Sequence, residues 1–182
     1  MDMTITTICD VLRKELWNNG YEYGFVVDGK KYKPNMDGFD AEYFQLAQTI
    51  SIVQEPTVTM QEKTGTCIDA AIVMKHLLDE LGVPSKIWLL YNPKKNKVHT
   101  VLTFEAEGKV VYLELTPQSS KEWYGKELVF ADEREFCQWY GEKGYEVSDV
   151  TARVVVGERP MFLLEKLGSG KNFAVEIETE LS

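Results

Sequence analysis

The chain has 182 residues, and its 44% hydrophobic and 12% aromatic content excludes a wholly disordered protein. It carries 20 Lys and Arg against 29 Asp and Glu, a net charge of −9. This acidic balance argues against nucleic acid or an anionic membrane as the main partner.

The cysteines and the amino-terminal residues bear on the cellular compartment of the protein. Residues 1–4 lack the basic and apolar regions of a signal peptide, and no apolar run is long enough to span a bilayer. Three cysteines, Cys9, Cys67 and Cys137, cannot all pair, and no Cys-x-x-Cys occurs. We therefore expect a reduced, cytoplasmic protein, although a signal removed by trimming stays open.

Residues 1–56 are predicted to form an N-terminal helix–hairpin–helix extension. Apolar residues at helical spacing predict a helix over residues 4–18. Asp28-Gly29, between predicted strands 21–27 and 31–33, is a strong hairpin signal. A second helix is expected over about residues 40–53, and Glu55-Pro56 closes it.

Residues 57–118 are predicted to be the functional core of a single domain. A polar, Thr-rich segment, 57–66, leads to a helix from Cys67 to Leu81, which Gly82 ends. Most of that helix surface is apolar, so we expect it to be covered on several sides. Three strands should follow, over residues 85–91, 97–105 and 109–116.

After Pro117 the pattern changes, and residues 119–182 are predicted to be a C-terminal α/β extension of the same domain. It should contain a helix near residues 132–142 and strands near 150–156, 161–164 and 173–179. Two histidines and scattered cysteines give no spacing typical of metal ligands.

Cys67 is the candidate nucleophile because it begins a helix. Unpaired backbone N–H groups and the helix dipole at that end favour the thiolate, which is the attacking form. Gly65 permits a sharp turn and close approach to a substrate carbonyl, and the N–H of Cys67 could donate to the developing oxyanion.

His99 is the candidate base, because His76 lies nine residues along the helix from Cys67 and on its opposite side. Glu114, on the next strand, would orient the imidazole. A four-residue loop between their strands would place the two side chains directly opposite each other. A two-residue loop would place them diagonally, and a three-residue loop would separate them.

The segment Gly65-Thr66-Cys67-Ile68-Asp69-Ala70-Ala71 and the helix exit at Leu81-Gly82-Val83-Pro84 resemble the transglutaminase-like superfamily. The His99 strand and Leu113-Glu114-Leu115-Thr116-Pro117 are similar to its histidine and acidic motifs. The resemblance covers about residues 57–118. It implies a papain-like α+β fold, with the cysteine helix packed on an antiparallel sheet.

The resemblance also implies a catalytic triad of Cys67 as nucleophile, His99 as base and acid, and Glu114 as orienting acid. Glu114 stands where that family usually has Asp, and no Trp lies just upstream of Cys67. Gln61, six residues before Cys67, is the candidate oxyanion donor, with Gln54 a weaker one. Candidates for lining a substrate cleft are Trp88, Tyr91 and Trp123.

We therefore expect thiol-dependent acyl chemistry on an amide of a peptide or protein, through a Cys67 thioester and without a cofactor. Hydrolysis, as by a peptidase or amidase, is preferred over transamidation to a lysine amine. The alternative is a catalytically silent transglutaminase-like domain that binds a peptide or protein. The sequence predicts neither the identity of the substrate nor the oligomeric state.

Overall fold

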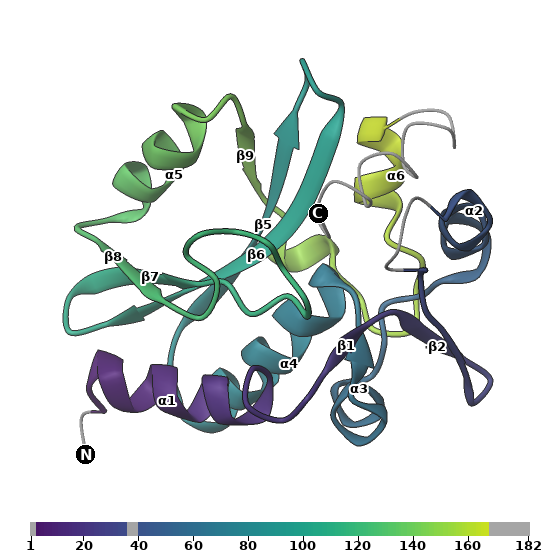
Figure 1. The fold of residues 1–182 in the computed structure, drawn as a ribbon. Helices are drawn as coiled ribbons and strands as arrows, with labels where there is room; N and C mark the ends of the chain where they lie inside the picture. Colours follow the sequence, from purple (N-terminus) through teal and green to yellow (C-terminus); the bar gives the residue numbers. More distant parts are fainter. Residues whose placement is uncertain (1–2, 36–39, 168–182) are drawn as a thin grey trace.

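An antiparallel sheet of five strands organises the fold. The computed structural model describes residues 3–35 and 40–167 and shows an α+β architecture. The strand order is β8-β7-β6-β5-β9 (Figure 1). The strands are β5 (Ser85–Asn92), β6 (Lys97–Ala106), β7 (Lys109–Leu113), β8 (Glu127–Phe130) and β9 (Glu146–Asp149).

Helices cover both faces of this sheet. Helix α4 (Cys67–Glu80) packs against β6 and β5 on one face, beside α1 (Ile5–Glu15). Helix α5 (Glu133–Gly141) lies on the other face, over β7, β8 and β9 (Figure 1). Helix α4 is buried along most of its length, as its nearly continuous apolar sequence predicts.

The β6–β7 hairpin sets the relative positions of the candidate base and acid. Ala106 pairs with Lys109, so the loop is the two-residue Glu107-Gly108. Both loop residues have positive φ, 52° and 68°, which matches the right-handed twist of the flanking strands. Of the three predicted loop lengths, the structure therefore has the one that places His99 and Glu114 diagonally.

A smaller group of elements holds the chain just before Cys67. It contains a short parallel pair of strands, β1 (Glu22–Tyr23) and β4 (Thr64–Gly65). A hairpin of β2 (Phe25–Val27) and β3 (Lys30–Tyr32) lies next to this pair. Helices α2 (Ala41–Ile50) and α3 (Pro56–Glu62) complete this group. Asp28 and Gly29 form the predicted hairpin turn, with φ of 50° and 76°.

Two apolar cores result from this arrangement. The larger core lies between the sheet and α4, and includes Leu12 of α1, Val73 of α4 and Leu102 of β6. The smaller core lies between the sheet and α5, and is mostly aromatic. Its buried members are Trp88, Leu90, Val101, Val110, Tyr112, Phe130, Phe136 and Tyr140.

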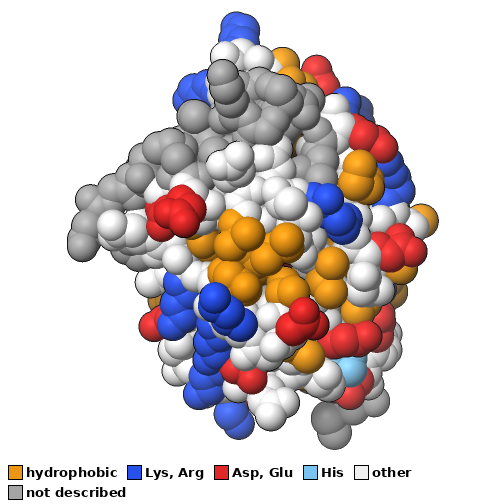
Figure 2. Space-filling view, turned by 90° about the vertical axis from the view of Figure 1, so that its right-hand side faces the viewer, with side chains coloured by type: hydrophobic (Ala, Val, Ile, Leu, Met, Phe, Trp, Pro, Cys, Tyr) orange, Lys and Arg blue, Asp and Glu red, His pale blue; other side chains and the backbone are white. Residues whose placement is uncertain are grey.

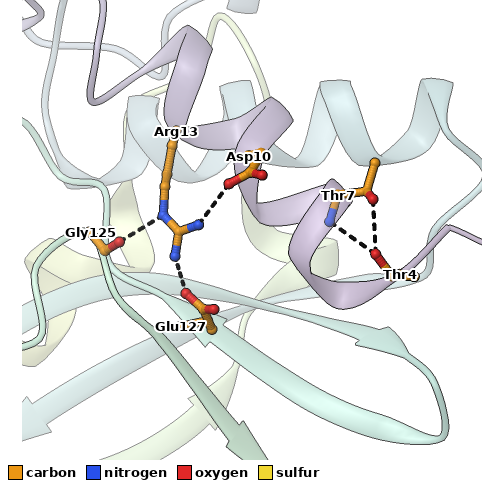
Figure 3. A network of polar contacts seen from close by, with 6 residues as sticks. All are labelled: Thr4, Thr7, Asp10, Arg13, Gly125 and Glu127. Atoms are coloured by element: carbon orange, nitrogen blue, oxygen red, sulfur yellow. Dashed lines mark hydrogen bonds and ion pairs between the residues drawn. The ribbon is translucent and has the colours of Figure 1, made fainter.

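Arg13 fastens α1 to the sheet edge. Its Nε donates to the carbonyl of Gly125 at 2.8 Å, and a terminal nitrogen forms an ion pair with Glu127 of β8 (Figure 3). Its other terminal nitrogen lies 3.1 Å from Asp10, and Thr4 caps the start of the same helix. The N-terminal helix is thus bound to a segment far along the chain.

Several predicted elements are wrong. No element was predicted for the segment 57–66, where the structure has most of α3, which starts at Pro56, a favourable first helical residue. Residues 150–156 form no strand but include a short 3₁₀ helix, Thr151–Arg153. Residues 161–164 belong to α6 (Met161–Leu167), which follows Pro160. The predicted strand 173–179 lies outside the described residues.

Strands β8 and β9 have no counterpart in the prediction, because each has only four residues. The strand predicted over 109–116 ends at Leu113. Among the described residues, no helix is both long and apolar enough to cross a membrane.

Candidate functional site

Cys67 lies at the first residue of α4, directly after β4, and only 4% of its surface is exposed. The preceding turn requires glycine, because a Cβ on Gly65 would lie 2.9 Å from Cβ of Asp69 and 3.0 Å from Cγ2 of Thr59. The position of the thiol is therefore fixed by the close packing of the Gly65 backbone against the side chains of Asp69 and Thr59.

Asp69 fixes the first turn of α4 from inside. Its Oδ2 accepts hydrogen bonds from the backbone N–H of Thr66 at 2.9 Å and from the Thr66 hydroxyl at 3.1 Å. Its Oδ1 accepts from the backbone N–H of Gln54 at 2.9 Å. Burial raises the pKa of Asp69 to about 6, although these hydrogen bonds act in the opposite direction.

Gln54 holds the neighbouring segments together with its own side chain. Its Oε1 accepts from the backbone N–H of Val26 at 2.7 Å. Its Nε2 donates to the Thr59 hydroxyl at 2.8 Å and to the carbonyl of Thr64 at 2.9 Å. Because the buried amide is occupied at both ends by these contacts, its role is to position β4 rather than to bind an oxyanion.

His99 and Glu114 form a buried pair. Nε2 of His99 lies 2.6 Å from Oε1 of Glu114, and the side chains are 1% and 2% exposed. The contact engages Nε2 of the imidazole ring. The two side chains that the sequence analysis paired are thus in direct contact.

Tyr112 supports this pair from the side of α5. Its hydroxyl donates to Oε2 of Glu114 at 3.0 Å and lies 2.6 Å from the hydroxyl of Tyr140. Nε1 of Trp123 donates to the same hydroxyl at 3.1 Å. The role of Tyr112 was not predicted, although residues two apart in an extended chain, such as Tyr112 and Glu114, point to the same side.

The pKa of Glu114 reflects two opposing effects. Burial alone would raise it, but the charge and hydrogen bond of His99, together with Lys121 and Tyr112, outweigh burial and lower it below the ordinary value of 4.5. Glu114 is therefore a carboxylate at neutral pH and can stabilise an imidazolium on His99.

Cys67 and His99 approach the sheet from opposite sides. His99 pairs with Leu90 and shares its strand face with Val101, both on the side of α5. Thr100 and Leu102 point to the side of α4, where Cys67 packs. The thiol and the imidazole therefore belong to different faces of the sheet.

The sheet diverges close to Cys67 and Glu114. The pairing of β6 with β7 ends at Thr103 and Tyr112, and Glu114 forms a bridge with Tyr124 instead. A cavity of about 10 Å³ lies beside this divergence. Cys67 and Glu114 both line it, together with Thr100, Leu115 and Thr116.

The other predicted site residues lie elsewhere. Gln61 is exposed on α3, and it is not among the residues that line the two cavities touching Cys67. Trp88 is buried in the aromatic core, where its Nε1 donates to Thr103. Tyr91 lies under the ammonium of Lys166 and is not among the residues that line the two Cys67 cavities. His76 lies 3.6 Å from Glu80 on the outer part of α4.

Trp123 is half-buried at the edge of the aromatic core, not in a cleft with Cys67. Its ring packs edge-on against Trp139, and the ammonium of Lys143 lies 4.2 Å from the centre of the Trp139 ring. Its hydrogen bond to Tyr112 makes it part of the support behind Glu114.

The described residues contain no group of three or more His, Cys, Asp or Glu side chains placed to hold a metal ion. No protein-family model and no curated protein matches the chain.

Proposed function

We propose that the protein catalyses thiol-dependent acyl chemistry on an amide, with Cys67 as nucleophile, His99 as base and Glu114 as orienting acid. The observation that carries the proposal is the buried 2.6 Å contact between His99 and Glu114, together with the cavity that Glu114 shares with Cys67. A charged pair is costly to bury. A catalytic role gives such a pair a reason to exist in the interior of the protein.

The reaction has two balanced steps. Sγ of Cys67 bonds to the amide carbonyl carbon while His99 takes the thiol proton, and the C–N bond breaks as the amine leaves with that proton. Water then attacks the thioester carbon and gives a proton to His99. The C–S bond breaks, a carboxylic acid is released, and the proton returns to the thiolate.

Hydrolysis is the preferred form of this chemistry, and transamidation replaces water by a lysine amine. The oxyanion would accept a hydrogen bond from the backbone N–H of Cys67, since the first N–H groups of a helix have no partner within the helix. The resemblance to the transglutaminase-like superfamily, with its papain-like core, supports the same roles and remains part of this proposal.

A second candidate function is supported by the burial of Cys67. The thiol is 4% exposed, and the cavities that it borders hold only about 30 and 10 Å³. A substrate carbonyl needs a local opening to reach it. A catalytically silent domain of the same fold, which binds a peptide or protein, needs no such opening.

The two functions are distinguished by the reactivity of Cys67. Iodoacetamide labelling of each cysteine is followed by mass spectrometry between pH 5 and 9, in the wild type and in His99→Ala. Cys9 and Cys137 serve as internal controls, since burial raises the pKa of Cys9 to about 12 and also raises that of Cys137.

The enzyme proposal requires that Cys67 is labelled fastest below pH 8 and loses that advantage in His99→Ala. It also requires that p-nitrophenyl acetate leaves an acetyl group on Cys67 in a burst that Cys67→Ser lacks. Labelling of Cys67 at the rate of the two control cysteines, unchanged by His99→Ala, would overturn it and favour the binding domain.

A further inference from the structure

A second, larger pocket opens onto Cys67 from the side away from the sheet. It lies between α2, the segment 51–53, the start of α4 and α6, and its volume is about 30 Å³. Apolar side chains dominate its lining, with Ala47, Val53 and Leu163 among them. Figure 2 shows that hydrophobic side chains also gather on the surface of this side of the molecule.

The acidic group of the pocket is engaged within the protein. Among the described lining residues Asp69 alone is acidic, and both its oxygens accept hydrogen bonds, from Gln54 and Thr66. Among the described lining residues there is no Lys or Arg. A substrate group that carries a charge would lose its hydration here without gaining a partner.

We infer that this pocket receives the acyl side of the substrate and selects a short, uncharged aliphatic group next to the carbonyl that Cys67 attacks. The inference rests on the proposed function and adds a substrate class to it. Burial of apolar surface supplies the binding energy, and the size of the pocket limits the chain to a few carbons. Such a group is provided by a short fatty acyl chain or by an aliphatic amino-acid side chain.

Ile52 is the specificity residue that can be changed with least disturbance. Ile52 lines the pocket and is 38% exposed, so a longer polar side chain at this position can extend into solvent. Val129 on β8 is 49% exposed and does not line the pocket. It therefore provides a matched apolar-to-charged control on the distant sheet edge.

The experiment measures the second-order rate of Cys67 acylation by p-nitrophenyl acetate, propionate, butyrate and hemisuccinate. In the wild type we expect about a fourfold gain per methylene up to butyrate, and a hemisuccinate rate below that of butyrate. Ile52→Lys should reduce the butyrate-to-acetate ratio toward one, and Ile52→Ala should reduce it less. Val129→Lys should leave the ratio unchanged.

Equal rates for acetate and butyrate in the wild type would overturn the pocket assignment. So would a butyrate-to-acetate ratio that neither Ile52 variant changes. In both cases the proposed function survives if acetylation of Cys67 still depends on His99. If none of the esters acylates Cys67, the proposed function fails, and the acyl pocket fails with it.

Discussion

Asp69 accepts a hydrogen bond from the backbone N–H of Gln54 at 2.9 Å, and so joins the first turn of α4 to the segment that precedes α3. The carboxyl group that makes this link is buried, and its pKa is about 6 instead of 3.8. The link that orders the candidate nucleophile therefore titrates in an accessible pH range.

Stability should fall as pH rises through this range. Between pH 4 and 6 the folded state retains a proton on Asp69 that the unfolded state has lost, so unfolding releases a proton. The contribution of Asp69 is full below pH 3.8 and declines by about 3 kcal/mol as pH rises to 6 and above.

Urea titrations of the wild type and Asp69→Asn at several pH values between 4 and 7 test this expectation. The free energy of unfolding of the wild type, minus that of the variant, should decrease with rising pH. A difference that stays constant would show that Asp69 titrates normally in the folded protein.

Glu114 should have the opposite pH dependence. Its folded pKa lies below the ordinary 4.5, so its stabilising contribution is present above pH 4.5 and is lost as pH falls through the folded value. Comparison of the wild type with Glu114→Gln between pH 3 and 6 isolates this effect. The exposed Glu122→Gln should change the free energy of unfolding by no more than about 0.5 kcal/mol at any of these pH values.

Tyr112→Phe should lower the free energy of unfolding by about 1 to 3 kcal/mol, because one hydroxyl serves Glu114, Tyr140 and Trp123. Tyr91→Phe is the matched control. The hydroxyl of Tyr91 makes a long 3.4 Å contact with Asn96, so its loss should cost less than about 0.5 kcal/mol. Equal effects of the two variants, measured by urea unfolding, would contradict the supporting role of Tyr112.

Gly65→Ala should destabilise the protein by about 1 to 3 kcal/mol, because the new methyl group meets Asp69 and Thr59 at contact distances that force a shift. Gly141→Ala, where a Cβ meets nothing within 4 Å, should leave stability unchanged or raise it by up to about 1 kcal/mol. Thermal unfolding of both variants gives the comparison. A tolerated Gly65→Ala would mean that the turn before Cys67 is less tightly packed than the structure indicates.

The sequence was most informative where local rules act alone. Helix α4 begins at Cys67 and ends one residue before the predicted Leu81, because a capping pattern and Gly82 mark its ends. The contact between His99 and Glu114 followed from strand alternation once the loop length was known. That length could not be chosen in advance, since hairpins with two, three or four loop residues all occur.

Other features depend on contacts across the fold and left no local signal. Strand β9 pairs with β5 over four residues, and its sequence Glu146–Asp149 is polar enough to be an ordinary loop. Trp88 was a candidate for lining a cleft, but its side chain lies in the aromatic core, where its Nε1 donates to Thr103 on β6. Cys67 and His99 lie on opposite faces of the sheet because of the face on which α4 packs. The periodicity of the sequence alone does not determine that face.

The ion pair of Arg13 with Glu127 joins residues 114 positions apart, and the same arginine binds the carbonyl of Gly125. The N–H of Gly125 in turn donates to the carbonyl of Glu114, so the first helix supports the backbone of the candidate acid. During synthesis on the ribosome, α1 emerges first, but this ion pair cannot form until β8 has been made. Helix α4, which packs beside α1, is made well before β8. The contact that ties α1 to the sheet edge can therefore form only after α1 and its helical neighbour are both available, late in the synthesis of the chain.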